Sequence, residues 1–171
     1  MKKVLFASSE CVPFIKTGGL ADVVGSLPKC FDKRYYDVRV ILPKYSCMKQ
    51  QWKDMMQYKT HFYMDFAGQS QYVGVLECVY DGVTFYFIDN EHYFTGDKPY
   101  TKHHWDIEKF MYFDRAVLSA LPLLDFRPDV IHCHDWQTGL IPVYLHDSFA
   151  GGDFFRGIKT VMTIHNLKFQ G

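Results

Sequence analysis

The sequence predicts an α/β fold: a Rossmann-like, doubly wound and mostly parallel sheet that carries a β-hairpin insertion. Short, continuous apolar runs recur along the chain, and such runs are typical of strands buried on both faces of a parallel sheet. Segments with apolar residues at helical spacing alternate with these runs. The middle of the chain differs, because its β-rich runs are joined by turn residues that favour antiparallel pairing.

The first unit is expected to be strand, loop, helix and strand. Val4–Ala7 is an apolar run that predicts a buried strand, and a glycine-bearing loop over 8–19 follows it. Apolar residues at helical spacing over 20–27 predict a helix that Pro28 either closes or kinks in its last turn. Residues 37–42 predict the second strand, so the segment forms a βαβ unit with a right-handed crossover.

A small antiparallel excursion is expected at the edge of the sheet. Residues 59–66, 72–80 and 84–88 are rich in β-branched and aromatic side chains. Asp81 and Gly82 separate the last two runs, and this pair between β-rich segments is a strong hairpin signal.

The second half returns to alternating helices and strands. Residues 89–104 are polar and aromatic, with Gly and Pro, and predict a long loop. Helical spacing over 107–121 predicts a helix of about four turns that stops at Pro122. The remaining elements are predicted over 129–134 (strand), 138–146 (helix, perturbed by Pro142) and 159–164 (strand).

Composition bounds the function. The 171 residues are 48% hydrophobic and 22% charged, as in a soluble globular domain, and the formal net charge is +0. Such neutrality argues against a nucleic-acid partner, and no apolar stretch approaches the roughly 18 residues of a membrane span. The five cysteines have irregular spacing, which favours free thiols in a reducing cytosol. The 18% aromatic content is expected mainly in the core, with stacking on sugars as a second use.

Polar residues follow three predicted strands at their carboxyl ends, the edge where ligands bind in open α/β sheets. Lys16, Gly18 and Gly19 precede the first helix, and free amides at a helix N-terminus suit a phosphate or pyrophosphate. The spacing is neither G-x-G-x-x-G nor a P-loop, and a simple turn explains the glycines equally well. His165 and Asn166, after the last strand, offer neutral donors and acceptors suited to a hydroxyl-rich ligand.

The remaining patch follows the strand at 129–134. His132, His134 and Asp135 are close in sequence, but no further ligand triplet accompanies them, so a metal site is not expected. Asp135 suits either a helix cap or a hydrogen bond to a sugar hydroxyl. Trp136 suits either stacking on a sugar or packing in the core.

Taken together, these blocks resemble bacterial glycogen synthases and plant starch synthases, in the family's order and approximate spacing from residue 2 to the last residue. The matching blocks are Lys16–Val23, preceded by Glu10–Phe14; His134–Trp136, followed by Thr138–Leu140; and Thr163–Leu167, followed by Phe169–Gly171. The resemblance implies a retaining transfer of glucose from ADP-glucose, or UDP-glucose, to the non-reducing end of an α-1,4-glucan. It also implies the two-domain GT-B architecture and no cofactor.

On the donor side, the resemblance places Lys16 against the phosphates or the sugar of the nucleotide sugar. The amides of Gly18 and Gly19 are expected against the pyrophosphate, with Asp22 close to the donor site.

On the sugar side, the resemblance assigns hydrogen bonds to the transferred glucose to Asp135 and His165, with His165 at the reacting centre. Asn166 is expected to support this contact. Tyr93, in the long loop, and Trp136 are expected to offer aromatic faces to substrate.

The sequence departs from the family pattern at Gln137, where the family commonly has His, and in residues 93–97, which lack a common Arg. The resemblance implies that residues 1–171 form an incomplete N-terminal domain, without the C-terminal nucleotide-binding domain. The fragment alone is then expected to be inactive, bacterial and cytoplasmic, with an exposed apolar surface where missing elements pack. Two alternatives remain: a stand-alone glucan-binding module, and a different sugar-nucleotide enzyme on the same fold.

Overall fold

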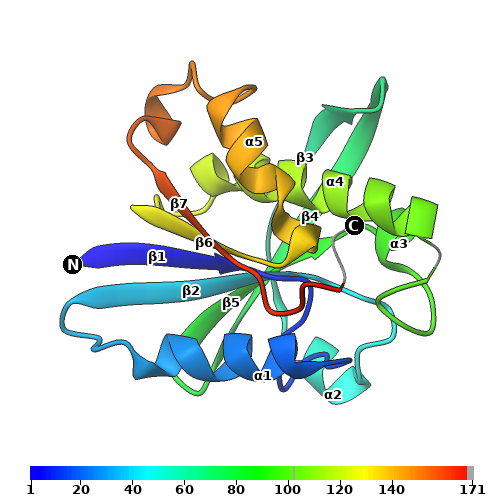
Figure 1. The fold of residues 1–171 in the computed structure, drawn as a ribbon. Coiled ribbons are helices and arrows are strands. Elements are labelled where there is room, and N and C mark those ends of the chain that lie inside the picture. Colours follow the sequence, from blue (N-terminus) through cyan, green and yellow to red (C-terminus); the bar gives the residue numbers. More distant parts are fainter. Residues whose placement is uncertain (102, 169–171) are drawn as a thin grey trace.

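A seven-stranded sheet runs through the middle of the molecule, with helices on both of its faces (Figure 1). The computed structural model describes residues 1–101 and 103–168. The strands are β1 (Lys2–Ala7), β2 (Tyr36–Pro43), β3 (Gln57–Phe66), β4 (Gln69–Tyr80), β5 (Val83–Asp89), β6 (Val130–His134) and β7 (Lys159–Thr163). Their order is β3-β4-β5-β2-β1-β6-β7, which confirms the predicted α/β fold class.

Five neighbouring strands, from β5 to β7, are mutually parallel, and β3 and β4 add an antiparallel edge. The central strand β1 is covered on both faces, since Leu5 and Phe6 are both fully buried. This burial explains why the strand is continuously apolar rather than alternating.

The predicted antiparallel excursion is correct for β3 and β4 but wrong for the third run. The strand β5 pairs antiparallel with β4 and parallel with β2, so it belongs to the parallel block. The hairpin at Asp81 and Gly82 is confirmed, with φ of +50° and +72° at the two residues. Both values lie in the left-handed region that tight hairpin turns require.

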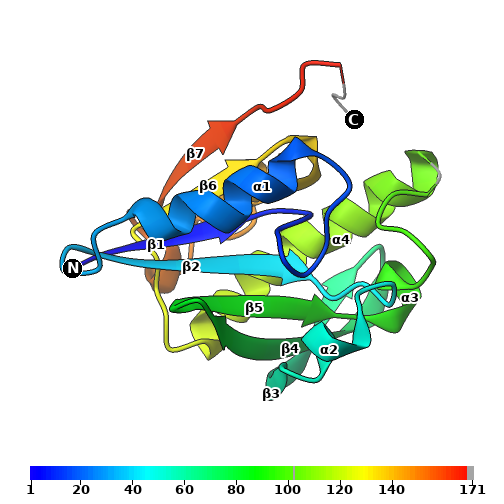
Figure 2. The same cartoon turned by 90° about the horizontal axis from the view of Figure 1, so that it is seen from below.

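The helices cover the two faces unequally. On one face α1 (Gly19–Ser26) lies across β1 and β6, and Figure 2 shows it in front of these strands. On the other face lie α4 (His103–Ala120) and α5 (Leu140–His146) (Figure 1). Shorter turns are α2 (Gln50–Lys53), α3 (Glu91–Phe94), η1 (Leu27–Cys30), η2 (Leu121–Leu123), η3 (Trp136–Thr138) and η4 (Asp153–Phe155).

The predicted loop over 89–104 is partly wrong. Its first part forms α3, because the Asn90 side chain caps the turn by accepting hydrogen bonds from the amides of His92 and Tyr93. The helix α4 begins at His103, four residues before the predicted start. The predicted perturbation at Pro142 does not interrupt α5, because this proline lies in the first turn, where its N–H is not needed.

The order of the strands creates a crevice at one edge of the sheet. From β1 the chain passes to β2 and later to β5 on one side, whereas β6 and β7 lie on the other. The loops that follow β1 and β6 therefore diverge at the carboxyl edge, the position where open α/β sheets bind ligands.

An apolar surface is exposed on the edge strand β7 and just after it, as the sequence predicted. Val161, Met162, Ile164 and Leu167, on and just after β7, are 48%, 42%, 61% and 74% exposed. Within the described part of the chain, no helix combines the length and apolarity that crossing a bilayer requires. All five cysteines are free, as expected, but only Cys11, Cys78 and Cys133 are buried.

Candidate active site at the carboxyl edge of the sheet

A cleft of about 850 Å³ opens at the carboxyl ends of β1, β6 and β7. Its walls come from the loop after β1, the start of α1, the segment before α4 and the residues that follow β6 and β7. The structure therefore brings together the three polar patches that the sequence placed at this edge. Six sequence-predicted site residues line the cleft: Gly18, Gly19, Asp135, Trp136, His165 and Asn166.

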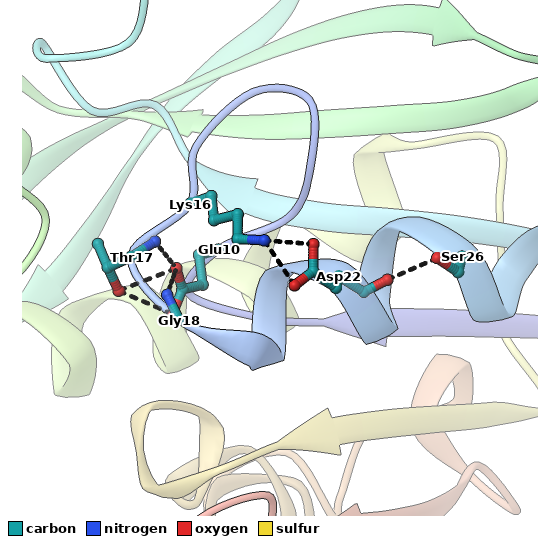
Figure 3. A network of polar contacts seen from close by, with 6 residues as sticks. All are labelled: Glu10, Lys16, Thr17, Gly18, Asp22 and Ser26. Atoms are coloured by element: carbon teal, nitrogen blue, oxygen red, sulfur yellow. Dashed lines mark hydrogen bonds and ion pairs between the residues drawn. The ribbon is translucent and has the colours of Figure 1, made fainter.

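A buried carboxylate organises the loop in front of α1. Glu10 is 3% exposed and accepts hydrogen bonds from the Thr17 amide and from the Thr17 hydroxyl at 3.0 Å (Figure 3). It also accepts from the Gly18 amide at 3.3 Å and from the Tyr100 hydroxyl at 3.1 Å. The Gly18 amide, predicted to face a pyrophosphate, is therefore bonded to Glu10 in this structure. In the sequence Glu10 stands out only as part of the motif that precedes the glycine turn, and no local pattern indicates this contact, because Glu10 lies eight residues before Gly18.

Lys16 and Asp22 form an ion pair beside this loop rather than lining the cleft (Figure 3). The Lys16 Nζ lies 2.7 Å and 2.6 Å from the two carboxylate oxygens of Asp22, and both side chains are about half exposed. Exposed pairs of this kind contribute little to stability, so the lysine can exchange its partner for an anionic ligand at small cost.

Asp135 ties the ends of β6 and β7 together. Its Oδ1 accepts a 2.6 Å hydrogen bond from the His165 amide, and its own amide donates to the Thr163 carbonyl at 2.9 Å. The Asp135 backbone has φ of +59°, a left-handed conformation that is strained for a residue other than glycine. The side chain does not cap the following turn, so the helix-cap alternative is excluded.

Three histidine rings stack from the sheet to the cleft. The ring centroids of His132 and His134 are 4.1 Å apart, and those of His134 and His165 are 5.2 Å apart. His134 Nδ1 lies 2.9 Å from His165 Nε2, and His132 Nε2 lies 2.7 Å from the Thr163 hydroxyl. Burial, aided by the neighbouring histidines, lowers the pKa of His134 to about 3, and burial also lowers the pKa of His132. The two inner rings are therefore neutral at physiological pH.

Tyr93 does not fit its predicted role. Its side chain is 2% exposed, and its ring is stacked against Tyr112 at 4.2 Å and Trp105 at 5.7 Å between centroids. Because α3 packs onto α4, the ring is buried among aromatic neighbours and has no face to offer a ligand. Among the described residues, Tyr100 is the tyrosine that lines the cleft, and no sequence pattern marks it.

The sequence of this chain matches a known protein family over almost its whole length. A family model described as the starch synthase catalytic domain matches residues 3–171. The chain belongs to this family. The matched range includes 169–171, the end of the third sequence block, which lies outside the described residues.

Relatives in the starch synthase family match almost the whole chain but only part of their own length. The glycogen synthase of Lachnospira eligens is 66% identical over 100% of this chain and 36% of the relative. The glycogen synthase of Anoxybacillus flavithermus is 51% identical over 99% of this chain and 35% of the relative. The catalytic domain of starch synthase IV from Arabidopsis thaliana, bound to ADP and acarbose, has a TM-score of 0.86 and 31% identity, covering 98% of this chain and 34% of that one. The chain thus spans about a third of the length of these relatives.

The two residues that directly follow Asp135, Trp136 and Gln137, also line the cleft. Trp136 packs edge-on against Phe110, with centroids 5.4 Å apart, and it also lines the cleft, so the packing interpretation is confirmed and stacking on a sugar stays a prediction. Gln137 is 8% exposed, and its Oε1 has no hydrogen-bond partner among the described residues. Asn166 is exposed at the cleft.

Nothing in the described residues gathers three or more His, Cys, Asp or Glu side chains in a way that could hold a metal ion. The polar side chains that line the cleft include the His165 imidazole, the carboxylates of Glu10, Asp106 and Asp135, the Gln137 and Asn166 amides and Lys168.

Proposed function

We propose that this chain forms the first part of a retaining glycosyltransferase that moves glucose from ADP-glucose to the non-reducing end of an α-1,4-glucan, in glycogen or starch synthesis. The observation that carries the proposal is the convergence of the α1 N-terminus, Asp135 and His165 on one cleft in a starch synthase family chain. A family structure with ADP and acarbose bound supports a nucleotide sugar and a glucan as ligands. UDP-glucose is the alternative donor.

The donor's pyrophosphate fits the end of the cleft formed by α1. The departing nucleotide gains negative charge, and the N-terminus of α1 together with the Gly19 amide provides positive potential there. Lys16 adds a full charge once it leaves Asp22. The Glu10 carboxylate is held by the Thr17 and Gly18 amides, so an incoming pyrophosphate competes with it or binds next to it.

The transferred glucose fits between Asp135, His165 and Asn166, which present an acceptor and neutral hydrogen-bonding groups. Transfer is favoured over hydrolysis, because a glycosidase needs two free carboxyl groups on opposite sides of the sugar. Among the described cleft residues, Glu10 is bonded to its own loop and Asp106 pairs with the buried Lys109 at 2.6 Å. This leaves Asp135 as the carboxylate that is placed to contact the sugar.

The second wall of the active site is assigned to the part of the polypeptide that relatives carry beyond this region. We propose a GT-B arrangement in which residues 1–171 supply the N-terminal wall and the remainder supplies the nucleotide-base pocket. The isolated 171-residue chain is then expected to have no synthase activity.

A chimera tests this function. Residues 1–171 replace the matching part of the glycogen synthase of L. eligens, and transfer of radiolabelled glucose from ADP-glucose to glycogen is measured. We expect activity, and we expect Lys16→Ala to reduce kcat/KM by about a hundredfold. Lys59→Ala is the matched control, since Lys59 forms a similar surface pair with Glu77.

The outcomes separate the alternatives. A folded chimera that binds maltooligosaccharide but transfers no glucose supports the stand-alone glucan-binding module instead. A folded chimera that neither transfers glucose nor binds maltooligosaccharide supports a different enzyme on the same fold. Equal losses for Lys16→Ala and Lys59→Ala contradict the proposed role of Lys16.

A further inference from the structure

The middle ring of the histidine stack has no role in the function proposed above. His134 is fully buried at the end of β6, and it lies between His132 and His165 with Phe6 also packed against it. A fully buried imidazole is costly unless its nitrogens have partners. The stability of the folded chain therefore depends on which nitrogen of the ring carries the hydrogen.

One nitrogen of His134 is paired and the other is not. Nδ1 lies 2.9 Å from His165 Nε2, a distance that requires one shared hydrogen between the two rings. Nε2 of His134 is buried and has no partner among the described residues. Because a neutral imidazole carries one N–H, the tautomer of His134 decides which ring donates this hydrogen bond.

The unpaired nitrogen selects one of the two tautomers. If His134 carried its hydrogen on Nε2, a buried N–H would remain without an acceptor. Orphaned buried N–H groups are rarer than under-used acceptors. The favoured form has hydrogen on Nδ1 of His134, which donates to Nε2 of His165 and leaves a lone pair at the unpaired position.

His165 is thereby held at two points from the end of β6. Its backbone amide donates to Asp135 Oδ1 at 2.6 Å, and its ring accepts from His134. With Nε2 of His165 used as an acceptor, the hydrogen of that ring lies on Nδ1. This N–H is the ring donor that remains for a ligand in the cleft, which His165 lines.

We propose that His134 is a positioning residue that fixes both the orientation and the tautomer of His165, so that His165 presents its Nδ1–H to the sugar. The inference rests on the proposed function for its catalytic meaning, but the tautomers themselves are a property of this chain. Burial of His134, which keeps its pKa far below neutrality, supports the assignment because the ring remains neutral when a ligand binds.

Nuclear magnetic resonance of the ¹⁵N-histidine-labelled chain tests the proposal directly. Long-range ¹H–¹⁵N correlations at pH 8 show which ring nitrogen of each histidine is protonated. We expect Nδ1–H for both His134 and His165. An Nε2–H form of His165 in the unsubstituted chain overturns the proposal, and this measurement needs no variant to fold.

Variants separate positioning from simple packing. His134→Phe keeps a ring but removes the hydrogen bond, so His165 is expected to change to the Nε2–H form that free imidazole prefers. His134→Asn places an amide donor near the lost Nδ1 and is expected to restore Nδ1–H. The matched control is His132→Phe, because His132 also stacks on His134 but bonds Thr163 instead. An unchanged His165 tautomer in folded His134→Phe contradicts the proposal.

The chimera links this chemistry to turnover. His134→Phe is expected to lower kcat by roughly tenfold with little change in KM, and His134→Asn is expected to recover most of it. If the unsubstituted chimera transfers no glucose, the proposed function is contradicted. The proposed effect of His134 on the tautomer of His165 is still tested by the magnetic resonance measurement on the chain.

Discussion

At the scale of single residues, the cleft depends on polar side chains that are buried and paired. Glu10 is the clearest case, because one carboxylate accepts hydrogen bonds from the Thr17 amide and hydroxyl, the Gly18 amide and the Tyr100 hydroxyl. These contacts hold the loop that the proposed donor must meet. Removing the charge at this point leaves each donor with a weaker partner.

Replacing Glu10 by glutamine is expected to destabilise the chain by about 1–3 kcal/mol, since an amide cannot accept from all these donors. Urea denaturation followed by tryptophan fluorescence measures the change in free energy of unfolding. Glu91→Gln is the control, because Glu91 is exposed in the first turn of α3. Equal and small effects of both substitutions show that Glu10 does not organise the loop.

The sequence identified most residues of the candidate site but not their partners. Gly18, Asp135 and His165 were placed at the cleft because carboxyl ends of parallel strands meet at one edge. The Lys16–Asp22 pair and the Glu10 contacts depend on loop conformation, which no periodic pattern encodes. Tyr93 was misplaced because a sequence does not show whether an aromatic ring faces a cleft or the core.

At the scale of elements, the apolar runs predicted strands well because burial on both faces leaves no room for polar side chains. The starts of α3 and α4 were missed, since their first turns are polar and aromatic and resemble a loop. Asn90, a preferred N-cap residue followed by an acidic residue at Glu91, was the signal that could have found α3. The strand β5 belongs to the parallel block because it pairs with β2. These two strands are far apart in the sequence, so no local pattern predicts this pairing.

The contact between α4 and α5 includes a buried acid whose protonation affects stability. Asp114 Oδ2 accepts a 2.9 Å hydrogen bond from the Leu140 amide at the start of α5, and Oδ1 has no partner among the described residues. Burial raises the pKa of Asp114 well above its usual range. The folded chain therefore binds a proton at Asp114 more tightly than the unfolded chain does.

We expect the stability contributed by Asp114 to be fully present below pH of about 4 and to be lost as pH rises toward the folded pKa. The difference in free energy of unfolding between the unsubstituted chain and Asp114→Asn should fall by up to about 1.4 kcal/mol per pH unit in that window. Urea titrations from pH 5 to pH 8 measure it, with the exposed Asp125→Asn as control. A difference that is independent of pH contradicts a protonated buried Asp114.

At the scale of the whole molecule, the chain presents two surfaces of opposite character. One is the polar cleft, and the other is the apolar surface of Val161, Met162, Ile164 and Leu167 on and after β7. The described sheet ends at β7, and an exposed apolar edge strand is a site for pairing with another chain. The sequence predicted this surface from the family pattern rather than from hydrophobicity alone.

The isolated chain is therefore expected to self-associate at micromolar concentration through the β7 surface. The double substitution Val161→Thr and Ile164→Thr should shift the population toward monomer in sedimentation velocity. Val143→Thr is the control, since Val143 is equally exposed on α5 away from this strand. A monomeric unsubstituted chain, or association unchanged by the double substitution, contradicts this expectation.

The central claim is that the cleft at the carboxyl edge performs glucose transfer, and Asp135 is its most direct probe. Asp135→Asn keeps the shape of the side chain and an acceptor for the His165 amide but removes the charge. In the chimera with L. eligens glycogen synthase, kcat/KM for transfer from ADP-glucose to glycogen is expected to fall by about a hundredfold, while the exposed Asp125→Asn stays within about twofold of the unsubstituted chimera. Equal rates for Asp135→Asn and Asp125→Asn in folded chimeras would contradict the assignment of this cleft as the site of glucose transfer.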